Sequence, residues 1–256
     1  AGSDCSGGAG IQADLKTFSA HKLFGMSVIV SVVAENTARV ISCFDISAQS
    51  VDEQMLAVFE DIVPKATKIG MLPSKELMAC IAQNLRRFKP ENVVIDPVMF
   101  AKNGYALMPP QNCEFFAQTM LEFADILTPN IPEAEFLCGF EIKDEKAMIK
   151  AAKALCQKGA KAVLLKGGHR KDNANDIFFD GQEIHLLEGK RIDTKNTHGT
   201  GCTLSSAIAS NLALGKDKLS AVKAAKEYVF GAILHSLSLG KGCGPTNHFY
   251  KFLEND

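Results

Sequence analysis

The chain has 256 residues, 46% of them hydrophobic, and its 28 basic and 29 acidic side chains nearly cancel. This length is enough for one large α/β domain or two small ones, and the balanced charge does not favour a nucleic-acid or membrane-surface partner. No apolar run approaches the ~20 residues of a membrane helix. The first ten residues lack the charged and apolar regions of a signal peptide. We therefore expect a cytoplasmic protein with no nucleic-acid or membrane partner.

Eight cysteines are spread along the chain, and no two of them form a CxxC pair. This spacing is unlike that of a structural zinc site. Reduced thiols are the default in the cytosol, and most of these cysteines lie within apolar helical patterns. We expect them to be small core residues, apart from any that the motifs below single out.

The first third of the chain begins with a glycine-rich turn. Residues 8–25 then have the pattern of a helix, and residues 27–37 form a continuous Val- and Ile-rich run that predicts a buried strand. Residues 47–63 have helical spacing, with Ser50 as the N-cap and Glu53 completing a capping box.

Strand-like and helix-like segments alternate through the rest of the chain. We predict strands at residues 68–72, 92–99, 125–130 and 162–168, and helices at residues 74–88, 111–124 and 144–159. Residues 176–189 contain two β-prone runs around Asp180-Gly181, which predicts a hairpin. Two helices, from about Gly201 and about Lys218, close the chain.

Repeated β-α units joined by short connections predict a mostly parallel sheet with helices on both faces. With no linker or repeat in sight, we expect residues 1–256 to form a single domain. Glycine-rich turns of this kind usually follow a strand, so we also expect a short strand before Ala1. Ligands bind beyond the carboxyl ends of the strands in such sheets. Unusual residues gather there: Asn36, Met71-Leu72-Pro73, Asp96-Pro97, Thr128-Pro129-Asn130 and Lys166-Gly167-Gly168-His169.

The segment "NTHGTGCTLSSAIA" (residues 196–209) leads directly into an apolar helix. Gly199 and Gly201 allow backbone N–H groups to point inward, and the helix start adds free N–H groups and a positive dipole end. This arrangement suits a phosphoryl group. A plain tight turn is the simpler alternative, but the added Thr, His and Cys favour a functional loop. It is not a P-loop, because GxxxxGK[ST] is absent.

Several charged residues also occupy candidate positions. Asn130 and Glu133 are three apart at a strand-to-helix junction, where they could hold hydrated magnesium or simply cap the helix. Asp96 ends a strand and favours a metal or phosphate role. Lys166 ends another strand, where it could bind phosphate or extend to solvent. Asp14, in the first turns of a helix, could bind a polar substrate group or be a surface acid.

Six blocks of sequence, in order along nearly the whole chain, resemble the hydroxymethylpyrimidine/phosphomethylpyrimidine kinases, the thiamine-pathway branch of the ribokinase-like family. The blocks are "AGSDCSGGAGIQADLKTFSAHKLFGMSVIVSVVAENT", "KIGML", "DPVM", "TPNIPEAE", "LLKGGH" and "NTHGTGCTLSSAIA". The resemblance implies a three-layer α/β/α sandwich. It also implies an MgATP-dependent kinase that phosphorylates 4-amino-5-hydroxymethyl-2-methylpyrimidine and then its monophosphate. Relatives are often homodimers.

The resemblance also implies roles for individual residues. The implied roles are a pyrimidine site at Gly2, Asp14, Glu35, Met71 and Val98, an anion hole at Gly199, Thr200 and Gly201, a magnesium element at Asn130 and Glu133, and a phosphate-contacting lysine at Lys166. An aminopyrimidine offers N–H donors and ring acceptors, which carboxylates and an apolar wall suit.

Cys202 stands where sugar kinases of the wider superfamily carry an aspartate base. A thiol at a helix N-terminus can have a depressed pKa. We therefore expect Cys202 to help deprotonate or orient the substrate hydroxyl, while the anion hole and magnesium stabilise charge during in-line transfer.

Two alternative functions remain. A related branch with pyridoxal kinase activity carries a second cysteine in the loop after "DPVM", where this chain has Ala101. That difference makes a two-cysteine pyridoxal mechanism less favourable. A non-catalytic nucleotide-binding module should have lost some of the site residues, and all are present. The segment "GKGCGPTNHF" near the C-terminus could cover the site or form a surface turn.

Overall fold

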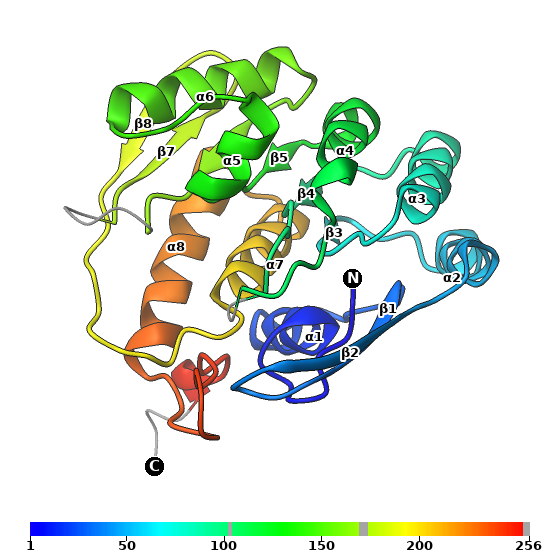
Figure 1. The fold of residues 1–256 in the computed structure, drawn as a ribbon, viewed down its shortest axis with the longest axis horizontal. Helices are drawn as coiled ribbons and strands as arrows, with labels where there is room; N and C mark the ends of the chain where they lie inside the picture. The colour runs from blue at the N-terminus through cyan, green and yellow to red at the C-terminus, as the bar shows by residue number, and fades with distance from the viewer. Residues whose placement is uncertain (102–103, 169–173, 253–256) are drawn as a thin grey trace.

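A six-stranded sheet forms the centre of the computed structural model, which describes residues 1–101, 104–168 and 174–252 (Figure 1). The strands lie in the order β3 (Thr67–Ile69), β4 (Val93–Ile95), β5 (Ile126–Leu127), β6 (Val163–Leu165), β7 (Asp176–Phe179) and β8 (Ile184–Leu187). Neighbours from β3 to β6 are parallel, and β7 and β8 form an antiparallel hairpin. The predictions of a mostly parallel sheet and of this hairpin are confirmed.

Helices cover both faces of the sheet (Figure 1). They are α1 (Gly10–Ala20), α2 (Ala48–Asp61), α3 (Lys75–Phe88), α4 (Cys113–Met120), α5 (Ile131–Cys138), α6 (Glu145–Gln157), α7 (Thr200–Ala213) and α8 (Lys218–Leu234), with short 3₁₀ turns at Pro110–Asn112, Leu121–Phe123 and Tyr250–Phe252. Val93 and Ile95 of β4 point into the core with α2 to α6, whereas Val94 points into a second core with α7 and α8. Because successive strand side chains point to opposite faces of the sheet, both faces are covered by helices, which produces the expected three-layer α/β/α sandwich.

Within the described ranges, no helix has both the length and the hydropathy needed to cross a bilayer.

The strand predicted within residues 27–37 is confirmed in part, but it is shorter than predicted, only partly buried and outside the central sheet. Only Ser31–Glu35 is a strand (β1), and it pairs antiparallel with β2 (Val40–Asp45), which the sequence analysis missed. Val32 lies directly opposite Phe44, and these side chains are 51% and 73% exposed. A continuous apolar run is typical of a buried strand, but it does not identify the sheet that the strand joins.

The predicted cap of α2 is also wrong. Ser47, rather than Ser50, is the N-cap, and its hydroxyl oxygen accepts a hydrogen bond from the Ser50 N–H at 3.2 Å. Glu53 instead accepts a hydrogen bond from Gln49. Both serines are capable caps, and the helix starts at the earlier one because this adds a further turn to α2.

The parallel strands bring three predicted site residues to one edge of the sheet. Asp96 follows β4, Asn130 follows β5 and Lys166 follows β6, and Asn130 and Lys166 form an isolated parallel bridge. Carboxyl ends of parallel strands meet at the same edge, which explains this grouping. His169, also noted in the sequence, lies outside the described residues.

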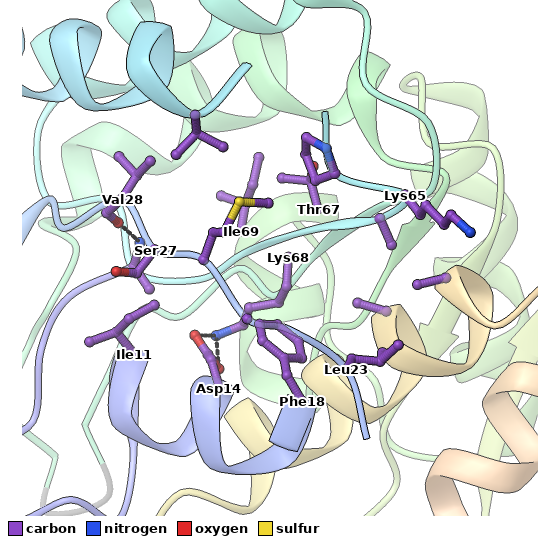
Figure 2. A pocket seen from close by; sticks show the side chains of 18 of the residues that line it. Ile11, Asp14, Phe18, Leu23, Ser27, Val28, Lys65, Thr67, Lys68 and Ile69 are labelled. Carbon is purple, nitrogen blue, oxygen red and sulfur yellow. Dashed lines mark hydrogen bonds and ion pairs between the residues drawn. The ribbon is translucent and has the colours of Figure 1, made fainter. Parts of the chain in front are cut away.

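An apolar cavity of about 460 Å³ lies beside the outer edge of β3 (Figure 2). Among the described residues β3 pairs with β4 alone, so its outer edge has no strand partner. On the opposite wall, the amino group of Ala1 donates to Val28 O at 3.0 Å, and Val30 N–H donates to Ala1 O at 3.1 Å. The strand expected before Ala1 stays a prediction.

Candidate active site

The start of α7 lies against the N-terminal glycine-rich loop. Gly199 is the N-cap of the helix and has a φ of 78°, a left-handed conformation that favours glycine. A Cβ at Gly199 would lie 1.7 Å from the carbonyl oxygen of Gly8, so side chains larger than hydrogen do not fit. The Thr200 hydroxyl donates to Thr197 O at 2.8 Å and closes the turn. The predicted anion hole thus has a helix start and a tight glycine turn.

A buried ion pair joins the same two loops. Nε2 of His198 lies 2.8 Å from Oδ2 of Asp4, and Asp4 is fully buried. Asp4 also accepts hydrogen bonds from the backbone N–H groups of Ser6, Gly8 and Ala9. Burial alone would raise the pKa of Asp4, but these hydrogen bonds and His198 hold it well below its usual range. This pair fixes how the loops meet.

Lys166 and Asp96 form a second ion pair at the sheet edge. Nζ of Lys166 lies 3.0 Å from Oδ1 of Asp96, and the Thr128 hydroxyl donates to the same oxygen at 3.2 Å. The lysine side chain is 16% exposed, whereas Asp96 is 3% exposed. A Cβ at Gly201 would lie 3.3 Å from Oδ2 of Asp96 and 3.7 Å from Nζ of Lys166. The pair therefore lies next to the first turn of α7.

Asn130 and Glu133 form the capping box of α5. The Asn130 side chain accepts from Glu133 N–H at 2.9 Å, and Glu133 Oε2 accepts from Asn130 N–H at 2.7 Å. This is the capping alternative that the sequence analysis left open. Burial raises the pKa of Glu133 to about 7 against the opposing effect of Lys166. The carboxyl is thus buried near Lys166 and Asp96, and its role in metal binding stays a prediction.

Cys202 occupies the first turn of α7. Burial raises the pKa of its thiol, Lys68 lowers it, Asp14 and Asp96 raise it, and a hydrogen bond from the Gly10 N–H lowers it. The net direction is upward. The depressed pKa expected from the helix start is therefore wrong, because burial and two carboxylates outweigh the cation and the helix N-terminus.

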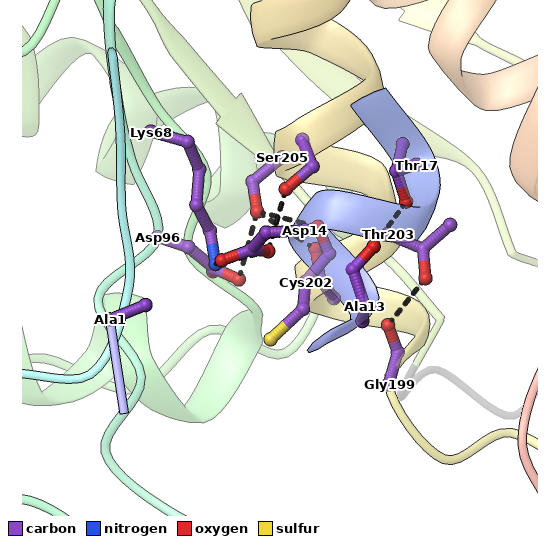
Figure 3. A network of polar contacts seen from close by, with 12 residues as sticks. Ala1, Ala13, Asp14, Thr17, Lys68, Asp96, Gly199, Cys202, Thr203 and Ser205 are labelled. Atoms are coloured by element: carbon purple, nitrogen blue, oxygen red, sulfur yellow. Dashed lines mark hydrogen bonds and ion pairs between the residues drawn. The ribbon is translucent and has the colours of Figure 1, made fainter. Parts of the chain in front are cut away.

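Asp14 is held by a lysine that the sequence analysis did not single out. Nζ of Lys68 lies 2.8 and 2.9 Å from the two carboxylate oxygens of Asp14, and each side chain is 1% exposed (Figures 2 and 3). The Ser206 hydroxyl donates to Asp14 Oδ1 at 2.6 Å. Ser206 is one helical turn from Cys202, so the ion pair packs against the α7 face that carries the thiol.

The remaining predicted pyrimidine residues lie around the same region. A Cβ at Gly2 would lie 2.9 Å from Sδ of Met71, which brings these two residues together. Val98, half-buried, follows Asp96 by two residues, and its N–H donates to Asp96 O at 2.8 Å. Glu35 ends β1 and is clustered with Asp4 and His198, with one ligand-type atom of each within 4.8 Å of the others.

Glu35 borders a second cavity, of about 340 Å³. The pKa of its carboxyl is raised to about 7, mainly by burial and then by Asp4, while His198 lowers it. The cavity is also lined by Thr37, Ala101 and the Gly242-Cys243 segment. The C-terminal loop reaches it because Cys243 N–H donates to Thr37 O at 2.8 Å and His198 N–H donates to Gly244 O at 3.0 Å. This loop packs against the site and is not a free surface turn.

Asp4 and Lys68 escaped the sequence analysis, and His198 was noted there only as one residue of the loop at 196–209, without its partner. Their partners are distant in sequence, with Asp4 and His198 separated by 194 positions and Lys68 and Asp14 by 54. The available signal was a lysine within an apolar strand and an aspartate within a glycine-rich turn, since buried charges require a partner.

Comparisons with known proteins agree with the resemblance seen in the sequence. The profile of the family described as phosphomethylpyrimidine kinase matches residues 4–247. Hydroxymethylpyrimidine/phosphomethylpyrimidine kinases of Rhizobium meliloti and Haemophilus influenzae are 48% and 44% identical to the chain, covering 98% and 97% of it and 96% and 94% of their own lengths.

Solved structures show the same relationship. The phosphomethylpyrimidine kinase of Clostridium difficile superimposes with a TM-score of 0.82 at 44% identity, over 91% of this chain and 96% of that one. An ADP complex of Bacillus subtilis pyridoxal kinase superimposes with a TM-score of 0.90 at 37% identity, over 99% and 96%. The ribokinase-like fold and the kinase assignment are thereby confirmed, and the chain belongs to the phosphomethylpyrimidine kinase family.

Proposed function

We propose that this protein transfers the γ-phosphoryl group of ATP to the hydroxymethyl group of 4-amino-5-hydroxymethyl-2-methylpyrimidine, and then phosphorylates the resulting monophosphate. The observation that carries the proposal is the Lys166–Asp96 pair beside the first turn of α7. A partly exposed lysine next to a helix N-terminus is a suitable phosphate site. The named activity of relatives that cover nearly the full chain supports the pyrimidine as acceptor.

The phosphates would meet two kinds of protein group. Gly199 and Gly201 offer backbone N–H groups at the start of α7, where the helix dipole adds positive potential, whereas the Thr200 N–H already donates to Thr197 O at 3.3 Å. The Lys166 ammonium can neutralise charge that develops on the transferred phosphoryl group. In the transfer, the acceptor oxygen bonds to the γ-phosphorus, the bond between the γ-phosphorus and ADP breaks, and the proton of the acceptor hydroxyl passes to solvent.

Magnesium fits the donor set at the sheet edge. Asp96, Asn130 and Glu133 supply the oxygen donors that Mg²⁺ prefers, and Mg²⁺ commonly keeps several waters between itself and the protein. Burial is the main cause of the raised pKa of the Glu133 carboxyl, and a divalent cation bound beside it would favour the ionised form. The ion would neutralise phosphate charge during transfer.

The pyrimidine would lie between Glu35 and the Gly2–Met71 contact. A Glu35 carboxyl with a pKa of about 7 can be protonated or ionised near neutral pH, so it can donate to a ring nitrogen or accept from the amino group. Met71 and Val98 would supply the apolar wall. Asp14 is already paired with Lys68, so its contact with substrate would be shared with that lysine.

Cys202 would contact the acceptor hydroxyl. Because burial raises the pKa of this thiol, the thiolate is the minor form near neutral pH. Orientation of the hydroxyl is therefore the role that the unliganded geometry favours over that of a strong base.

Pyridoxal is the second candidate acceptor, because pyridoxal kinases of Bacillus subtilis and Staphylococcus aureus are among the structural neighbours. Steady-state kinetics with ATP against the hydroxymethylpyrimidine, its monophosphate and pyridoxal decide between them. We expect turnover of both pyrimidines and its loss when Mg²⁺ is chelated. No turnover of either pyrimidine would reject the proposal, and a dominant rate with pyridoxal would replace it with the second candidate.

We also propose that residues 1–256 form one domain and that the protein works in the cytoplasm. We further propose that it forms a homodimer through the outer face of β1 and β2. Val32, Ile41 and Phe44 leave apolar side chains exposed there. Light scattering after gel filtration should report a dimer that Phe44→Asp dissociates. Leu214→Asp, at a residue 54% exposed elsewhere, is the matched control. A monomeric wild-type protein would refute the dimer.

A further inference from the structure

The Lys68–Asp14 pair is more deeply buried than a pair that only stabilises the fold needs to be. Both side chains are 1% exposed, and both carboxylate oxygens contact the ammonium. Taking two charges out of water is costly, and apolar side chains of similar size often stabilise a fold as well as a buried pair does. A lysine in this position therefore calls for an explanation beyond stability.

The position of the pair provides that explanation. Ser206 ties Asp14 to α7 one helical turn after Cys202, so the ammonium is fixed close to the thiol (Figure 3). Gly70 leaves room for it, because a Cβ there would lie 2.8 Å from Nζ of Lys68. The ammonium is sealed from solvent, so salt screens it little, and it favours negative charge on the Cys202 sulfur.

We propose that Lys68 is a positioning residue of the kinase site: its buried ammonium, clamped by Asp14, is the cation that governs whether negative charge can form at Cys202. The role in turnover rests on the proposed function, whereas the effect on the thiol does not. The alternative is that Lys68 merely neutralises Asp14 and leaves Cys202 unaffected.

Other charged groups that act on Cys202 must be accounted for. Asp14 from α1 and Asp96 from the end of β4 oppose charge on the sulfur, whereas Lys68 from β3 favours it. Lys166, from the end of β6, also interacts with the thiol but is held by Asp96.

The test is the pH dependence of Cys202 alkylation by iodoacetamide, followed peptide by peptide with mass spectrometry. Lys68→Met removes the cation and keeps an apolar side chain of similar length. A unit charge nearby shifts a pKa by about one unit or more, so the midpoint should rise by at least about one pH unit. At a pH below the midpoint, alkylation of Cys202 should slow about tenfold.

Two controls accompany this variant. Lys226→Met removes a lysine whose ammonium pairs with Asp176 between α8 and β7, and it should leave the Cys202 profile unchanged. Alkylation of the exposed Cys5 monitors the reactivity of iodoacetamide in every sample, and the Cys5 alkylation rate should be the same in all variants. A folded Lys68→Met protein with the wild-type Cys202 profile would overturn the proposal.

Asp14→Asn provides the opposite perturbation and decides the question if Lys68→Met does not fold. It keeps the ammonium and removes a carboxylate that opposes charge on the sulfur, so the Cys202 midpoint should fall. A midpoint that stays constant or rises would reject the role of the pair.

In kinase assays, Lys68→Met should lower kcat at least tenfold while the KM for ATP stays within twofold. Absence of turnover in the wild-type protein would reject the proposed function and leave the alkylation result standing.

Discussion

Replacement of Gly199 by alanine tests whether the two glycine-rich loops must touch. A Cβ at this position would lie 1.7 Å from Gly8 O, half of the 3.4 Å at which ordinary contact begins. The φ of 78° adds about 1–2 kcal/mol for a left-handed alanine, and overpacking adds about 1–3 kcal/mol. We therefore expect Gly199→Ala to lower the free energy of unfolding by about 2–5 kcal/mol.

Gly139→Ala is the matched control, because Gly139 has a φ of 77° but nothing within 4 Å of its Cβ position. Gly139→Ala should lower the free energy of unfolding only through the left-handed backbone conformation, by about 1–2 kcal/mol. For a chain of this size, 1 kcal/mol corresponds to about 2–4 °C in Tm. Differential scanning calorimetry should thus show a fall of about 2–8 °C for Gly139→Ala and a clearly larger fall for Gly199→Ala.

The two variants should also differ in activity. If the loops separate, the N–H groups at the start of α7 move relative to Lys166, and a shift of 1 Å in a catalytic group can cost on the order of a hundredfold in rate. The kcat/KM of Gly199→Ala should fall by about that factor, while Gly139→Ala keeps near wild-type values. Equal losses of Tm in the two variants, with full activity in Gly199→Ala, would refute the reasoning.

Three further variants test single groups. Asp4→Asn should lower Tm at pH 7 because it weakens the hydrogen bond to His198. The pKa of Asp4 is depressed in the folded protein, so the difference in Tm from wild type should shrink as pH falls through 3.8 and below. A difference in Tm that does not change with pH would contradict this role of Asp4. Glu35→Gln should gain stability relative to wild type as pH rises from 4.5 towards about 7, since the folded carboxyl binds more protons than the unfolded one in that window; parallel unfolding curves would contradict this. Cys202→Ala should lower kcat more than Cys202→Ser, whose hydroxyl can still orient the acceptor, and normal turnover in the alanine variant would eliminate any role for the thiol.

The elements that could be predicted from sequence are those whose signal is local. The helix at Lys75–Phe88 and the hairpin around Asp180-Gly181 follow from residue periodicity and turn chemistry within a few positions. By contrast, the sheet that Ser31–Glu35 joins depends on its pairing with Val40–Asp45 and on burial by distant elements. An apolar run carries no information on the pairing partner of a strand or on its burial by distant elements.

The same distinction applies to the site. Asp96 and Lys166 could be found because charged residues at the ends of apolar strands are unusual, and parallel strands bring such ends together. Lys68 could be suspected from its place in an apolar strand, but its partner could not, because Asp14 lies on another element 54 positions away. The direction of the Cys202 pKa was also beyond the sequence, since it depends on burial and on Asp14.

The two lysine–aspartate pairs beside α7 differ in the exposure of their lysines, which suits them to different roles. Lys166 is 16% exposed, so a phosphate can approach it and compete with Asp96 for its ammonium. Lys68 is 1% exposed and contacts both oxygens of Asp14, so an incoming anion cannot reach it. We therefore propose that Lys166, rather than Lys68, binds phosphate, and that the charge of Lys68 remains constant when the nucleotide binds. A fixed charge of this kind acts on Cys202 whether or not the nucleotide is bound.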